Sequence, residues 1–200
     1  DFLGQLLSNG KKAPMYKVLV QDKKLTSRAS AYNNSQELAG EFRISITANG
    51  NNNLADVESA VIESFKKFEE ESFTDQDVER IKAGLETSFY NSISSVLGKS
   101  FQLAQYNVFA GDPGFITEDI ENIKKVTKKD IIRVYNKYIK DKPYVITSFV
   151  PKGKLELAAN NSKKAAIVEE VIKENVDVKI ADKNNKVEKT PSKFDRSVAP

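Results

Sequence analysis

The sequence has 200 residues, 40% hydrophobic and 30% charged, with a mean hydropathy of −0.47, as expected for an ordinary globular domain. It contains no histidine and no cysteine, which excludes disulfides, thiolate zinc sites, cysteine nucleophiles and a Ser-His-Asp triad within the chain. The net charge of +3 comes entirely from residues 151–200, and the neutral body before them argues against a nucleic-acid surface. No apolar run is long enough to span a membrane.

Two short helices open the chain. The first covers Phe2 to Leu7 and is stopped by the polar residues that follow it. Pro14 opens the second, since proline suits the first turn of a helix, and this helix ends near Asp22. Its predicted inward side chains are Met15, Val18 and Leu19.

A β-hairpin follows these helices. Its first strand runs from Leu25 to Tyr32 and is rich in small and β-leaning residues. In the second strand Phe42, Ile44 and Ile46 alternate with polar residues, which is typical of a half-buried antiparallel strand. Residues 33–39 form the connecting loop.

Apolar residues at helical spacing then predict a series of helices. One follows an N-cap at Asn53 and the next an N-cap at Thr74. Gly98 is expected to separate the second of these from a helix over 101–109. Further helices start at Thr117 and Thr127. The expected inward residues are Leu54, Val57, Val61, Phe65 and Phe68; Val78, Ile81, Leu85 and Phe89; and Ile131, Val134, Tyr135 and Tyr138.

Tyr144 to Val150 is predicted to return as a third strand, which Pro151 ends. Because strands pair early and helices follow in a block, the fold class is α+β: an antiparallel sheet with several helices packed on one face. We expect a half-domain over 1–153, a short extension over 154–174 with a helix from Ala165 to Ile172, and a flexible polar linker over 175–200.

Several short motifs occur in an order that resembles one family. They are Pro14-x-Tyr16-Lys17-x-Leu19 before a strand ending Ser30-Ala31-Tyr32, the acidic helix start at 73–82, Thr127-Lys128-Lys129-Asp130-Ile131, and the strand over 144–150. Together they resemble a half-domain of the insulinase/pitrilysin zinc peptidases, the group that includes mitochondrial processing peptidase. The resemblance covers residues 1–153 and rests on the order of weak signals.

The resemblance implies a module made of two related halves. One half carries zinc on an inverted His-x-x-Glu-His motif, and the other has the same fold without metal. This chain lacks histidine and resembles the metal-free half. The implied parent is a large bacterial-type protein in which a sister half-domain holds the zinc, the family's first strand precedes Asp1, and a further module follows the linker. A periplasmic or cell-envelope location is favoured by resemblance only.

The resemblance also identifies one departure from the family pattern. At the positions where relatives grip peptide substrate with an Arg and a Tyr, this chain has Val20 and Ser27. Arg28 is one residue away and, by strand alternation, is expected on the opposite face. The grip pair is therefore absent, and no catalytic or metal-binding residue is assigned.

Other residues were weighed as sites against simpler structural roles. Three successive carboxylates at 69–71 point about 100° apart on a helix and are expected to be a solvated helix end. Asp75, Asp77 and Glu79 suit a helix start, and 49–53 suits a plain loop better than a phosphate cradle. Tyr32, Tyr106, Tyr135 and Tyr138 are expected in the core. The remaining candidate is strand Phe42, Ile44 and Ile46, which could bind a peptide if it lies at a sheet edge.

Three hypotheses follow. The first is a non-catalytic structural and substrate-chamber half of a zinc metallopeptidase, which by itself is not an enzyme. The second is a non-enzymatic subunit or peptide-binding module with the same fold. The third is an unrelated α+β adaptor domain.

Overall fold

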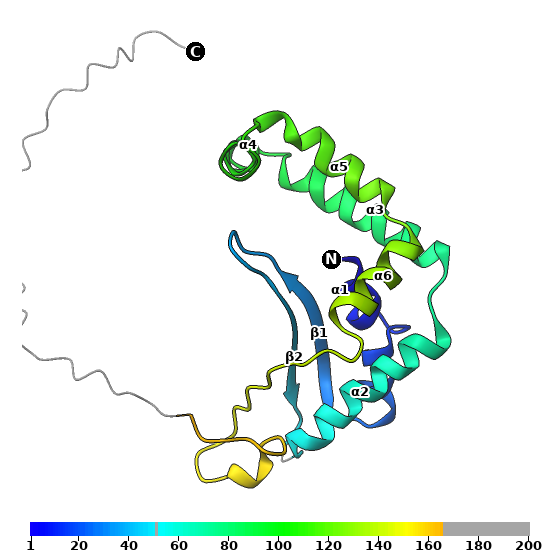
Figure 1. Ribbon diagram of the computed structural model, residues 1–200, viewed down its shortest axis with the longest axis vertical. Helices are drawn as coiled ribbons and strands as arrows, with labels where there is room; N and C mark the ends of the chain where they lie inside the picture. The colour runs from blue at the N-terminus through cyan, green and yellow to red at the C-terminus, as the bar shows by residue number, and fades with distance from the viewer. Residues whose placement is uncertain (51, 166–200) are drawn as a thin grey trace, which may run out of the picture. The chain divides into compact units, whose positions relative to one another are not determined.

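A computed structural model describes residues 1–50 and 52–165, and its helices and strands follow the predicted order (Figure 1). Residues Asp1–Ser162 form one compact unit. The elements are α1 (Phe2–Ser8), the π-helix η1 (Tyr16–Asp22), β1 (Thr26–Asn34), β2 (Glu41–Ala48), α2 (Leu54–Glu71), α3 (Asp75–Ser92), α4 (Val96–Ala110), the 3-10 helix η2 (Pro113–Phe115), α5 (Ile116–Lys125), α6 (Lys128–Tyr138) and the 3-10 helix η3 (Leu155–Leu157).

The predicted hairpin is confirmed as an antiparallel pair of β1 and β2. Ala29 lies opposite Ile46 and Ala31 opposite Ile44, and these residues share the face that turns toward the helices. Tyr32 lies opposite Arg43 on the other face. The hairpin therefore has one apolar and one polar face, as the period of two in its sequence requires.

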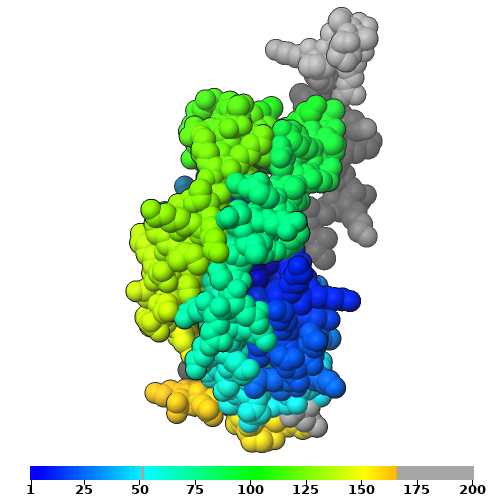
Figure 2. All heavy atoms as spheres, turned by 90° about the vertical axis from the view of Figure 1, so that its right-hand side faces the viewer, coloured from blue at the N-terminus to red at the C-terminus, as the bar shows by residue number. Residues whose placement is uncertain are grey.

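Helices cover only the apolar face of the hairpin. Figure 1 shows α1, α2 and α6 on one side of the strands, and Figure 2 shows that face from outside as a continuous layer of helical residues. The largest fully buried apolar side chains of the described residues are Leu7, Met15, Val18 and Leu19. Burying each such side chain stabilises the fold by about 1.5–3 kcal/mol. The inward positions predicted for the second helix are thus confirmed.

Capping residues set the starts of three helices where the sequence predicts them. The Asn53 side chain accepts a hydrogen bond from the Ala55 amide at the start of α2. Thr74 forms a reciprocal capping box with Asp77 at α3. Thr127 forms the same arrangement with Asp130 at the start of α6. Each cap contributes about 1 kcal/mol, so these starts are determined locally.

The helix residues predicted to point into the core agree best with the structure near the hairpin. In α2, Val57 and Phe68 are buried, and the small side chains of Ala60 and Ser64 between them are fully buried. Tyr138 of α6, predicted inward, is 59% exposed, which corrects that prediction. The helix ends at this residue, and Ile139 after it packs against the core instead.

Gly98 does not separate two helices as predicted. The break lies at 93–95, and Ser95 caps α4, so that Gly98 is in the first turn of α4. A Cβ built on Gly98 would lie 1.9 Å from the carbonyl oxygen of Ser92. The glycine therefore permits the sharp approach of two helix ends rather than breaking a helix.

The predicted third strand is wrong. Residues 144–150 have no regular secondary structure and pair with no strand in the described part of the chain. Tyr144 donates a hydrogen bond to Glu58 of α2, while Val145 and Phe149 are 92% and 91% exposed. A strand requires a neighbour to satisfy its backbone groups, and the alternating sequence alone cannot supply one.

The remaining predictions concern the carboxyl-terminal part. The extension begins with η3, where the Asn53 side chain donates to the carbonyl of Glu156. The helix predicted from Ala165 to Ile172, apart from its first residue, and the linker over 175–200 lie outside the described residues. No helix in the described ranges is long and apolar enough to cross a membrane.

Candidate functional site

The outer edge of β2 carries no paired strand in the described residues, and the backbone geometry shows which groups it presents. The amide of Ala31 in β1 bonds to the Ser8 hydroxyl on α1, so it points away from β2. The carbonyl oxygen of Thr47 accepts from the Thr26 hydroxyl, so it points toward β1. In an antiparallel ladder such directions alternate, which leaves the outward backbone groups of β2 on Phe42, Ile44 and Ile46.

The side chains of Phe42, Ile44 and Ile46 are half-buried and pack against the core on the helix side. They are therefore not available to a ligand on the open face of the sheet. A peptide added at this edge would meet their backbone groups and the polar side chains of the alternate positions. The structure brings the predicted candidates together at an edge, and whether they bind peptide stays a prediction.

The open face of the hairpin carries polar side chains, of which Tyr32 was expected in the core and Arg43 was not expected at a site. Arg43 lies opposite Tyr32 across the strands and forms an ion pair with Glu41. The Tyr32 hydroxyl and then the Glu41 carboxylate raise the pKa of Arg43. The signal was present in the sequence, because residues alternating with the apolar positions of a one-sided sheet must face outward.

A second recess lies beside the free edge of β1. It is a groove of about 530 Å³ between β1 and the turn after α1, and its only charged lining residues are Lys11 and Arg28. Ser27, at a position where the resemblance would place a substrate-gripping residue, also lines it, while Val20 lies half-buried on η1. Outward groups alternate along β1, so the amide and carbonyl of Ala29 face this groove.

The alternation assumed for Arg28 is interrupted by a bulge. The strands shift register between Thr26 and Ala29, and both Ser27 and Arg28 are exposed. The Thr26 hydroxyl stabilises the bulge because it accepts from the Arg28 amide and donates to the Thr47 carbonyl across the strands. Strict strand periodicity therefore does not give the direction of Arg28.

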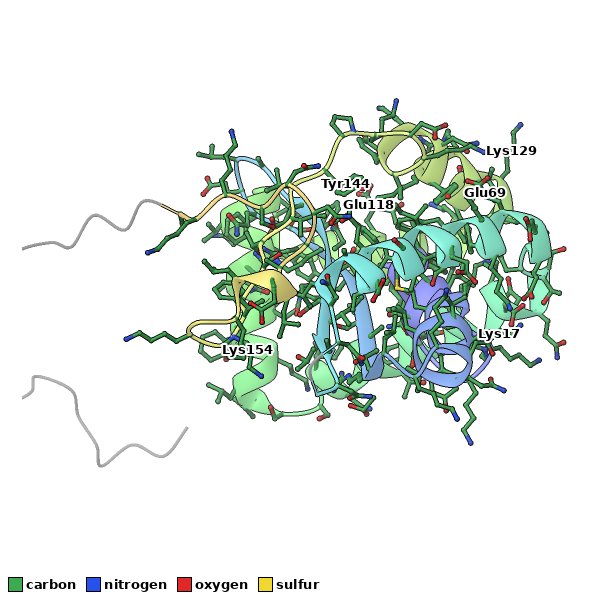
Figure 3. The ribbon with its side chains drawn as sticks, turned by 90° about the horizontal axis from the view of Figure 1, so that it is seen from below. Lys17, Glu69, Glu118, Lys129, Tyr144 and Lys154 are labelled. Carbon is green, nitrogen blue, oxygen red and sulfur yellow. The ribbon has the colours of Figure 1, made fainter. Side chains whose placement is uncertain are left out.

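The carboxylates at 69–71 point apart, as expected. Glu69 accepts hydrogen bonds from Tyr135 at 2.7 Å and Lys140 at 2.8 Å, on the α6 side of α2. Glu71 pairs with Lys17 at 2.7 Å. Figure 3 shows Glu69 and Lys17 on different sides of α2. The Lys140 ammonium and then the Tyr135 hydroxyl lower the pKa of Glu69, so the two helices are joined by a charged hydrogen-bond cluster.

The other polar candidates also have structural partners. Asp77 belongs to the capping box, where the Thr74 hydroxyl lowers its pKa, and Glu79 pairs with Lys82. In the loop before α2, the Asn49 amide donates to the carbonyl of Lys24, which holds the loop against the start of β1. These contacts give the polar residues a structural role, so no ligand is needed to explain them.

Two of the four tyrosines lie in the core. Tyr106 donates to Asp119, and burial followed by this hydrogen bond raises the pKa of Tyr106 to about 12. Burial also raises the pKa of Tyr135. Tyr32 and Tyr138 are exposed, which corrects the expectation that they belong to the core.

The chain does not fit a zinc site. Histidine and cysteine are absent from the sequence. Among the described residues, no group of three or more acidic side chains is placed to hold a metal ion.

Comparison with known proteins identifies a sequence family for the first part of the chain. Residues 1–85, from α1 into α3, match the family model of the peptidase M16 inactive domain. No curated protein matches the sequence.

Solved structures share the fold. A protease from Helicobacter pylori is 24% identical with a TM-score of 0.59 over 70% of this chain and 34% of its own. A peptidase M16 inactive domain from Pseudomonas fluorescens is 14% identical with a TM-score of 0.56, over 70% of this chain and 32% of its own. The inactive peptidase domain of a protein assigned as a zinc protease, from Bordetella parapertussis, is 16% identical with a TM-score of 0.57, over 69% and 74%. The chain thus spans about one third of the length of the first two.

Proposed function

We propose that this chain, whose residues 1–85 match the family model of the peptidase M16 inactive domain, is an insulinase-like half-domain and the non-catalytic, substrate-chamber half of a larger zinc metallopeptidase. The match to an inactive domain is the observation that carries the proposal. It also excludes the hypothesis of an unrelated α+β adaptor.

Any zinc in the parent belongs to a different half-domain. This chain offers no histidine or cysteine ligand, so its own residues take no part in metal chemistry. Its role is to bury part of its surface against a sister half and to present the open face of the hairpin, with Arg43 and Tyr32, toward the substrate chamber. A bacterial periplasmic or envelope location belongs to the same proposal and is supported by resemblance.

Metal content and hydrolysis test this role directly. The purified chain, dialysed against zinc and then against buffer, is expected to retain no zinc by elemental analysis. It is also expected to leave a mixture of fluorogenic peptides uncleaved. EDTA-sensitive cleavage by the chain alone would contradict the proposal.

The alternative is a non-enzymatic subunit or peptide-binding module with the same fold. It is favoured by Val20 and Ser27, which occupy the positions of the family's substrate-gripping pair. The coding sequence upstream of Asp1 separates the two: a half-domain with His-x-x-Glu-His supports the peptidase, and a half-domain without it supports the subunit.

Peptide contact, common to both alternatives, is proposed at the hairpin edges. The backbone groups of the β2 edge, and those of Ala29 in the groove beside β1, suit β-addition, whereas the Ala31 amide of β1 already bonds to Ser8. Arg28 beside β1 and Arg43 beside β2 suit a carboxylate on the peptide. Titration of a labelled acidic peptide tests this by fluorescence anisotropy. Arg28→Ala should weaken binding at the β1 groove and Arg43→Ala at the β2 edge, each by about 5-fold or more. Binding unaffected by either substitution excludes both edges.

A further inference from the structure

The groove beside β1 is closed at one end by helix α1. The amide of Ala31 donates to the Ser8 hydroxyl, and a Cβ built on Gly4 would overlap the carbonyl oxygen of Ala31. Helix α1 therefore covers both backbone groups of Ala31. A peptide that paired along β1 past Ala29 would collide with this helix.

A bulge limits the groove at its other end. The register of the two strands shifts between Thr26 and Ala29, so the regular alternation of outward backbone groups begins at Ala29. Between the bulge and α1, Ala29 is then the one residue of β1 whose amide and carbonyl face the groove. A long strand added here would gain a single residue pair. The edge therefore suits the end of a peptide chain better than an internal segment.

The charges around the groove select the carboxyl end. Lys11, on the turn after α1, and Arg28, on β1, line opposite walls, and no acidic residue lines the groove. Neither forms an ion pair with another described residue. The first 30 residues contain six Lys or Arg and two Asp or Glu, so the surroundings are basic as well. This field attracts a terminal carboxylate and repels a terminal ammonium.

The remaining lining residues fit a backbone end rather than a large side chain. Tyr16 lines the groove, and its hydroxyl, which bonds to no other described residue, is a donor for a carboxylate. Gly10 and Ser27 are small, and the volume of about 530 Å³ lies within the roughly 300–1,000 Å³ of small-ligand pockets.

We propose that this groove binds the free carboxyl terminus of an extended peptide. Ala29 pairs with the backbone near the end of the peptide, and Lys11, Arg28 and the Tyr16 hydroxyl bind the terminal carboxylate by charge-assisted hydrogen bonds. The inference rests on the peptide contact proposed above and narrows its ligand to chain ends.

Three labelled peptides test this selection by fluorescence anisotropy. All are the same short alanine and threonine peptide with fluorescein at the amino end. The first ends in a free carboxylate, the second in a carboxamide, and the third in a carboxamide with one internal threonine replaced by glutamate. The free-acid peptide should bind the purified chain about 10-fold more tightly than either of the others.

Two results of this comparison overturn the proposal. If the free acid and the carboxamide bind equally, or the free acid does not bind, the groove does not recognise a terminal carboxylate. If the glutamate peptide binds as tightly as the free acid, any acidic side chain suffices and a chain end is not required. Either result leaves the non-catalytic role intact, which peptide hydrolysis by the chain alone would contradict.

Substitutions locate the carboxylate. Lys11→Ala and Arg28→Ala should each weaken binding of the free-acid peptide by about 5-fold and leave the carboxamide peptide unchanged. The matched control is Lys12→Ala, which removes the same charge from a residue that does not line the groove and that interacts electrostatically with Asp77. Equal weakening by Lys12→Ala would assign the effect to the general charge of the region and overturn the site.

Hydrogen exchange tests the backbone contact. The free-acid peptide should slow exchange at the Ala29 amide and change the Ala31 amide little, because Ala31 already bonds to the Ser8 hydroxyl. Protection at Ile44 of β2 with none at Ala29 would place the peptide at the other edge of the hairpin and overturn the proposal.

Discussion

The substitution Tyr135→Phe removes one hydroxyl from the joint between α2 and α6. The ring is 3% exposed and packs against Phe68 at a centroid distance of 5.1 Å, a contact that phenylalanine keeps. The hydroxyl donates to the Glu69 carboxylate at 2.7 Å. Only this hydrogen bond is lost, so the variant isolates its contribution.

The expected loss is about 1 kcal/mol in the free energy of unfolding. A hydrogen bond to a charged group contributes about 1.5–3 kcal/mol when shielded. The side chain of Glu69 is 35% exposed and keeps Lys140 as a partner, so solvent screening brings the expected loss below this range. For a domain of this size, that loss lowers Tm by about 2–4 °C.

The loss should depend on pH in one direction. Lys140 and then Tyr135 lower the pKa of Glu69 below its ordinary 4.5. A carboxyl with a depressed folded-state pKa stabilises fully above the unfolded value and loses that contribution as pH falls through the folded value. The difference in unfolding free energy between Tyr135→Phe and the unsubstituted chain should therefore be complete at neutral pH and become smaller below pH 4.5.

Urea denaturation followed by circular dichroism measures these differences, and Glu69→Gln completes a double-mutant cycle. The effect of Tyr135→Phe should shrink in the Glu69→Gln background. An equal loss in both backgrounds, or a loss above about 3 kcal/mol, would refute the reasoning, because it would place the energy in ring packing.

Two further predictions concern close backbone contacts. Gly98→Ala should destabilise the chain by about 1–3 kcal/mol, because its Cβ would collide with the Ser92 carbonyl. Gly84→Ala has open space around it in α3 and should be neutral or stabilising by up to about 1 kcal/mol. Equal Tm shifts of the two variants in thermal melts would contradict this. Ser8→Ala should cost about 1 kcal/mol and speed hydrogen exchange at the Ala31 amide, which loses its acceptor, and unchanged exchange there would show that this bond does not hold α1 to β1.

Local sequence was sufficient to determine the elements and much of the functional assignment. The alternation of Phe42, Ile44 and Ile46 fixes a one-sided strand, and the capping residues Thr74 and Thr127 fix two helix starts, because these signals act over a few residues. The missing histidines exclude a zinc site of the family's type wherever the chain folds.

Tertiary structure decided what depends on neighbours. Residues 144–150 have the composition of a strand, but pairing requires an adjacent edge that the sequence cannot show. In the sequence Gly98 suggests a helix break, but in the fold a glycine is required there because the Ser92 carbonyl lies too close for a side chain. The bulge at Ser27 and Arg28 interrupts the alternation of side-chain directions that the sequence implies. Local sequence thus determines which face each helix and strand offers, whereas the fold decides which faces are covered and, among the described residues, leaves the outer edge of β2 without a paired strand, because covering depends on partners distant in the chain.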